Sequence, residues 1–190
     1  LPALGLDYLS NPESRFLTKP FTSDSSAHKQ IPAADRWVFE ARELVKGRYY
    51  AQARALFDAA LAEEPWHRGA LLGLADVEFR RARYEVGLIH VRRALQLDGY
   101  DPEANFVAGN LYRALGRVTD ASDAYGWAAR SMEFRSAAYV QLAELALAAN
   151  DLVEATRYAD LAIDYDRYNL AARQVLAIAE RREGDVVRAE

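Results

Sequence analysis

The sequence NFVAGNLYRALGRVTDASDAYGWA, at residues 105–128, contains the pattern that most of the chain repeats. Two runs of helix-forming residues flank Gly116, the residue type that most readily ends a helix in a left-handed conformation. Asp101-Pro102 stands shortly before the stretch, and such a pair is typical of a helix start, with Asp as the cap and Pro at the first helical position. The stretch therefore predicts one helix over 102–115 and another over 118–131, joined by a tight turn.

Small residues recur at an interval of 34 along the chain, in three series that share one phase. The first series is Ala41, Ala75, Gly109, Ala143 and Ala177; the second is Ala53, Gly87, Ala121, Ala155 and Ala189; the third is Ala60, Ala94, Ala128 and Ala162. An interval of this length is that of one helix–turn–helix unit in a stacked array. Small side chains at helix contacts let the axes approach to about 8–10 Å. The interval therefore predicts stacked pairs of antiparallel helices.

The same interval divides the chain into units. We expect them at 34–67, 68–101, 102–135, 136–169 and, as a partial unit, 170–190. Turn sequences fall at corresponding places in most units, namely Gly47-Arg48, Gly116-Arg117, Asn150-Asp151 and Gly184-Asp185. The second unit has Ala82-Arg83 there, which is not a turn sequence, so we expect packing to hold that helix pair together.

Residues 1–33 do not share the repeat and form an N-terminal extension or linker. Its apolar residues, among them Phe16, Leu17, Phe21 and Ile31, would either cover the end of the first unit or occupy a groove of the array. Covering the end is favoured, because an uncapped first unit exposes apolar surface.

The last unit lacks a polar capping helix, which a terminal repeat needs. We therefore expect the parent protein to continue past Glu190. Its open C-terminal edge would also allow self-association.

The third unit resembles the tetratricopeptide repeat family almost residue for residue. The matching positions are Asn105 to Tyr112, Leu115 to Arg117, Asp120-Ala121, Tyr125 and Ala128. Glu133 and Arg167 depart from the family, which usually has Pro there as Pro65 does, and Glu78 stands where an aromatic residue is usual. The resemblance covers about residues 34–190. It implies an all-α fold, a right-handed α-solenoid of antiparallel helix pairs.

The composition excludes several classes of partner. The chain carries a net charge of −4 and has no cysteine. An acidic balance argues against nucleic-acid binding, which depends on a basic surface, and without cysteine there are no disulfides or thiolate metal sites. No stretch reaches the roughly 18 consecutive apolar residues of a membrane span. We expect a soluble protein, cytoplasmic or periplasmic, that neither binds nucleic acid nor inserts into a membrane.

Few side chains could carry out chemistry. The spacing of His28, His67 and His90 places no two imidazoles on one helix face, which predicts no metal site. No phosphate-binding, dinucleotide-binding or serine-hydrolase motif is present, so we expect no cofactor and no catalytic residue. The carboxylate pairs at 63–64 and 164–166 fall at helix ends, where solvated surface is expected rather than a general acid–base pair.

The only basic cluster is formed by Arg80, Arg81, Arg83, Arg92 and Arg93. One interpretation is a contact for an anion or an acidic peptide. The other, which we favour, is the solvated face of the second unit, balanced by nearby acidic side chains.

In the family, the first helix of each unit lines the concave face of the superhelix. By that resemblance, the partner-binding residues here are Val38, Arg42, Lys46, Leu72, Asp76, Phe79, Phe106, Asn110, Arg113, Val140, Glu144 and Gln174. Phe79 and Phe106 are the expected anchors, since aromatic side chains carry a large share of interface energy. The alternative is that either ring packs within its own unit.

Some members of the family grip a C-terminal carboxylate with Lys and Asn on the first helix. Asn110 matches one such position, but Val38, Leu72 and Phe106 stand where the Lys is needed. The resemblance therefore implies an incomplete clamp.

Two functions follow as expectations. The first is a non-catalytic scaffold that binds a protein or peptide on the concave groove. The second is the helical segment of a larger bacterial multidomain enzyme, with its active site outside this chain. The run at 165–174 resembles helical arrays joined to sugar-processing domains.

Overall fold

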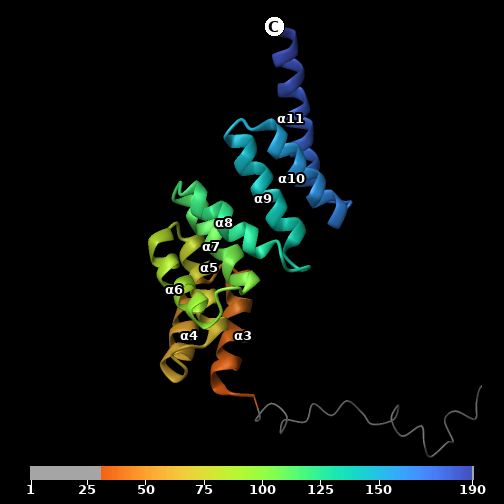
Figure 1. The fold of residues 1–190 in the computed structure, drawn as a ribbon. Helices are drawn as coiled ribbons and strands as arrows, with labels where there is room; N and C mark the ends of the chain where they lie inside the picture. The colour runs from red at the N-terminus through yellow and green to blue at the C-terminus, as the bar shows by residue number, and fades with distance from the viewer. Residues whose placement is uncertain (1–30, 190) are drawn as a thin grey trace, which may run out of the picture. The chain divides into compact units, whose positions relative to one another are not determined.

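The computed structural model describes residues 31–189, with their side chains as far as Gly184. Those residues form helices and no strand. In chain order the helices are α3 (Ala33–Lys46), α4 (Tyr50–Glu63), α5 (Arg68–Arg80), α6 (Tyr84–Leu97), α7 (Pro102–Ala114), α8 (Val118–Ala128), α9 (Arg135–Ala148), α10 (Leu152–Tyr165) and α11 (Leu170–Ala189). Consecutive helices pack as hairpins, and each hairpin packs on the next (Figure 1). The predicted all-α array of helix pairs is confirmed for the described residues.

The array forms a compact unit that begins at Ala33. The roles predicted for Phe16, Leu17 and Phe21 lie outside the described residues. Ile31, which belongs to the same segment, is exposed.

Four hairpins turn at one register position, and in each the residue there has a positive φ. These residues are Arg48 (64°), Ala82 (55°), Gly116 (72°) and Asn150 (61°). Gly and Asn adopt this conformation readily, whereas Ala does so at a cost of about 1 kcal/mol or more. Since the second hairpin turns at the same place without a turn residue, its packed core must hold Ala82 in place, as predicted from the sequence.

The small-residue series lie where the helices touch. Every member from Ala41 to Ala162 is buried. A methyl group added at Gly109 would lie 2.5 Å from Cε1 of Tyr125, which shows how closely α7 and α8 approach. Ala177 on α11 is exposed, and the side chain of Ala189 lies outside the described part.

Two helix ends differ from the sequence-based prediction. α8 ends at Ala128 rather than near Ser131, and the chain continues in a tighter turn, in which the backbone N–H groups of Arg130 and Ser131 donate to the carbonyl oxygens three residues before them. Arg135 donates to the carbonyl oxygens of Ala129 and Arg130, each at 3.0 Å. α11 continues through Gly184, where a turn was expected. A glycine inside a helix costs only about 1 kcal/mol, so Gly184 alone does not end one.

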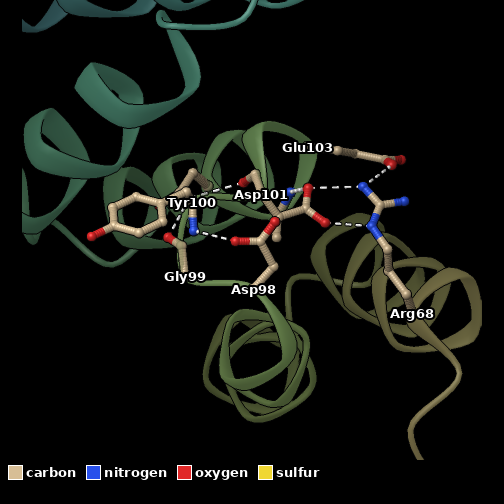
Figure 2. Close-up of polar contacts among 8 residues, drawn as sticks. Arg68, Asp98, Gly99, Tyr100, Asp101 and Glu103 are labelled. Atoms are coloured by element: carbon tan, nitrogen blue, oxygen red, sulfur yellow. Dashed lines mark hydrogen bonds and ion pairs between the residues drawn. The ribbon is translucent and has the colours of Figure 1, made fainter.

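A polar link joins the second hairpin to the third. The Asp101 carboxylate caps α7 by accepting a bond from the backbone N–H of Ala104 at 3.0 Å. It also pairs with Arg68 of α5, which donates to Asp101 Oδ1 at 2.8 Å and contacts Glu103 at 2.9 Å (Figure 2). Burial raises the pKa of Asp101, but the bonds from Arg68 and Ala104 outweigh that effect and hold its pKa below the usual value. The carboxylate therefore stays charged in the folded protein at neutral pH.

Candidate functional site

An open cleft of about 420 Å³ lies along the first helices of three successive hairpins. Its lining comes from α3, α5 and α7, with Phe57 from α4 and Phe134 from the segment before α9. The lining residues are Arg42, Val45, Lys46, Phe57, Leu72, Gly73, Asp76, Arg80, Glu103, Phe106, Val107, Asn110 and Phe134. We call it the inner cleft.

The inner cleft brings together half of the predicted partner-binding residues. They are Arg42, Lys46, Leu72, Asp76, Phe106 and Asn110. Each lies on the first helix of its hairpin, so repetition of the unit aligns them.

The remaining predicted residues lie elsewhere. Val38 and Val140 are buried in the hairpin cores. Phe79 packs on Tyr84 of its own hairpin, with 5.6 Å between ring centroids. Arg113 pairs with Glu144 across α7 and α9. Gln174 is exposed on α11.

The floor of the inner cleft is aromatic and ordered by packing. The Phe106 ring lies 5.7 Å from the Tyr125 ring and 5.6 Å from the Phe134 ring, centroid to centroid. The Tyr125 hydroxyl donates to Asn110 Oδ1 at 2.8 Å, and burial raises the pKa of Tyr125, so this hydroxyl stays protonated as a donor. Phe106 itself is only half-buried, which leaves part of its ring available to a ligand.

The rim of the inner cleft carries both signs of charge. Arg80 pairs with Asp76 at 2.8 Å, and Glu103 is held by Arg68 (Figure 2). Lys46 pairs with Glu43 on its own helix at 2.6 Å. These pairs fix the rim side chains but are exposed, so each contributes little to stability.

Two of the five arginines of the basic cluster pair with carboxylates, Arg80 with Asp76 and Arg83 with Glu78. Glu78 is fully buried beneath the cluster, with Oε1 2.8 Å from a terminal nitrogen of Arg54 and Oε2 2.6 Å from Nε of Arg83. Arg93 donates to the carbonyl oxygen of Pro65. These pairings support the interpretation as a balanced face rather than an anion site.

Seven cleft residues were not predicted as partner-binding from the sequence: Val45, Phe57, Gly73, Arg80, Glu103, Val107 and Phe134. Phe134 did carry a signal, because it shares its register position with Trp66, Tyr100 and Tyr168 at the interval of 34. Those three rings are exposed, whereas Phe134 turns toward Phe106. Its direction depends on the early end of α8, which the sequence pattern did not predict.

Over the described residues, no group of three or more His, Asp or Glu side chains could hold a metal ion. No helix among residues 31–189 combines the length and apolar character that a membrane crossing needs.

The histidines among the described residues are His67 and His90. His67 Nδ1 accepts a bond from the backbone N–H of Ala70 and so caps α5. Burial lowers the pKa of His90.

Comparison with family models gave no match, and comparison with curated proteins gave none either. Several solved structures share the fold. PilF of Pseudomonas aeruginosa superimposes with a TM-score of 0.76 at 18% identity, over 82% of this chain and 71% of that one. A tetratricopeptide repeat protein from Parabacteroides merdae gives a TM-score of 0.69 at 18% identity, over 80% of this chain and 61% of that one.

A third structure is that of YrrB, a tetratricopeptide repeat protein with an unusual peptide-binding site. It gives a TM-score of 0.64 at 20% identity, over 75% of this chain and 73% of that one. The hairpins of similar length, the interval of 34 and these superpositions agree, and the described chain has the tetratricopeptide repeat fold.

Proposed function

We propose that this chain is a non-catalytic interaction scaffold that binds an extended peptide segment of a partner protein in the inner cleft. The observation that carries the proposal is the convergence of α3, α5 and α7 on one aromatic floor, at Phe106. In the proposal residues 34–190 form the binding array, and residues 1–33 are an N-terminal extension to it.

The chemistry of the inner cleft suits a peptide. Phe106 and Val107 offer a half-buried apolar floor above the buried Leu72, while Arg42 and Asn110 offer polar groups at its edge. A few well-placed polar groups around an apolar surface are typical of ligand sites in proteins. Successive helices present these groups in steps, which matches an extended chain better than a compact ligand.

The fold supports the same conclusion by analogy. YrrB, which shares the fold at 20% identity, is described by its peptide-binding site. An incomplete carboxylate clamp, with apolar residues at 38, 72 and 106, favours recognition along the peptide rather than at its C-terminal carboxylate.

Selection of peptides by display on the intact chain, followed by fluorescence anisotropy, tests the proposal. Phe106→Ala should lower the affinity for the selected peptides by about tenfold or more, because it removes the aromatic floor. Phe79→Ala is the matched change, since that phenylalanine lies on α5 outside the inner cleft. Arg42→Glu probes the exposed rim without disturbing the core.

Thermal unfolding of each variant separates loss of binding from loss of structure. If Phe106→Ala and Phe79→Ala bind the selected peptides equally well, the inner cleft is not the site.

A further inference from the structure

A second cleft lies between α8, α9 and α10, where the repeat is least regular. α8 has 11 residues, whereas α4, α6 and α10 have 14 each. A cleft of about 480 Å³ lies beside the end of α8. A smaller hollow of about 290 Å³ adjoins it, and both are lined by Arg130. We call the larger one the tyrosine–arginine cleft (Figure 1 shows its three helices).

Three tyrosines form one wall of the tyrosine–arginine cleft. Tyr139 stacks on Tyr158 at 6.1 Å and 25° and on Tyr165 at 6.1 Å and 22°. Tyr165 is half exposed. The hollow on the other side of Arg130 is lined by Tyr100 and Trp127, whose ring centroids are 4.8 Å apart. Arg157 lies over the Tyr158 ring, 4.1 Å from its centroid, and Arg135 over the Tyr165 ring, 4.7 Å from its centroid. Both hollows beside Arg130 therefore have aromatic residues in their lining.

The charged side chains of the tyrosine–arginine cleft are all arginines. Arg135 donates to the carbonyls of Ala129 and Arg130, and Arg157 pairs with Glu154. Arg130 lies over the Trp127 ring, 4.2 Å from its centroid, and none of the acidic side chains described in 31–184 forms an ion pair with it. No residue that lines either hollow is acidic. In a protein with 28 acidic and 24 basic residues, this local surplus of positive charge stands apart.

The repeat does not require these residues. The register position of Arg135 holds Asp101 and Asn169 in neighbouring units, and both cap the following helix. With Arg135 in that place, α9 begins without a side-chain cap. A helix without its cap loses about 1 kcal/mol. Arg135 instead donates to the carbonyl oxygens of Ala129 and Arg130, so this junction keeps a polar link but exchanges a capping side chain for a cation. Departures from a local rule are expected at functional sites.

We propose that the tyrosine–arginine cleft binds an acidic peptide segment. A carboxylate of the segment pairs with Arg130, and a neighbouring apolar side chain lies against Tyr165, the most exposed of the three tyrosines. Because hollows open on both sides of Arg130, the ligand is an extended chain that crosses it. A nucleic acid fits less well, since its affinity needs many neutralised phosphates and only Arg130 is uncommitted here.

Fluorescence anisotropy with a labelled peptide of Glu, Leu and Gly tests the proposal on the intact chain. A second labelled peptide, with Lys in place of every Glu, measures the requirement for carboxylates. We expect saturable, salt-sensitive binding of the acidic peptide and none of the basic one. Arg130→Glu should lower the affinity for the acidic peptide by about tenfold or more, because it replaces a charge-assisted bond with repulsion.

Arg117→Glu is the matched variant, since Arg117 is another exposed arginine over an aromatic ring, 4.7 Å from the centroid of Tyr112, and lines neither cleft. It should leave the affinity unchanged. Phe106→Ala should also leave it unchanged, which separates this cleft from the inner cleft. Equal losses in the Arg130 and Arg117 variants, or no saturable binding, would overturn the proposal. Tighter binding of a single-stranded oligonucleotide through Arg130 would overturn the choice of a peptide.

Discussion

The junction between the second and third hairpins differs from the junction between the third and fourth at one register position. In the first, Asp101 caps α7 and pairs with Arg68 of the preceding hairpin. In the second, Arg135 occupies the equivalent place and binds the carbonyls of Ala129 and Arg130 instead. The interval of 34 is the same in both.

The difference shows that a repeat array can keep its period while one junction changes its chemistry. The capped junction is short, and Arg68 and Asp101 link its two hairpins. The helix directly before it, α6, has 14 residues. The uncapped junction shortens the helix before it and opens a cleft lined by arginine and tyrosine. Three experiments test this difference between the two junctions.

Removal of the carboxylate charge at the regular junction should have the largest effect. Asp101→Asn keeps the shape of the side chain but removes its charge, and should lower the free energy of unfolding at pH 7 by about 2–3 kcal/mol. Because the folded-state pKa of Asp101 is depressed, its contribution is complete above the unfolded value of 3.8 and disappears as the pH falls through the folded-state pKa.

Denaturant titrations at neutral and acidic pH measure this change. The wild-type and variant curves should converge in acid. A difference that stays constant across that pH range would mean that charge is not what Asp101 contributes.

The third hairpin belongs to both junctions, and two of its glycines test its two sides. Gly109→Ala should destabilise by about 2 kcal/mol, because the new methyl group meets the Tyr125 ring at 2.5 Å. Gly126→Ala, on the open side of α8, meets nothing within 4 Å and should stabilise the helix by about 0.5–1 kcal/mol. Thermal melts of the two variants should move in opposite directions; a shared direction would show that α7 and α8 pack differently.

The smallest loss of stability is expected at the junction between the third and fourth hairpins. Arg135→Met removes the bonds to two carbonyls and should cost about 1 kcal/mol. Since arginine does not titrate in this range, the loss should be the same at pH 7 and in acid, unlike that of Asp101→Asn. A loss that depends on pH would assign Arg135 an ion pair that the structure does not show.

The sequence predicted those features that repeat. The small-residue series placed the helix contacts, and Asp101-Pro102, Gly116 and Asn150 placed a helix start and two turns, because each of these rests on local backbone preference. Ala82 shows how packing overrides that preference, since an alanine there adopts the conformation of a glycine.

The features that the sequence did not predict depend on contacts between units. After the early end of α8, Arg135 donates to the carbonyl oxygens of Ala129 and Arg130, and Phe134 lies against Phe106. For the candidate site, the repeat register correctly placed Arg42, Leu72 and Asn110 on the face of the inner cleft. It did not place Phe79 correctly, because that ring packs on Tyr84 of its own hairpin.

Phe134 and Arg135 are consecutive residues, yet one lines the inner cleft and the other the tyrosine–arginine cleft. A single planar peptide group joins them, so a shift of the 129–134 segment moves both walls together. Occupants of the two clefts that prefer different positions of this segment would therefore compete without touching. Thermodynamic linkage makes that antagonism equal in both directions.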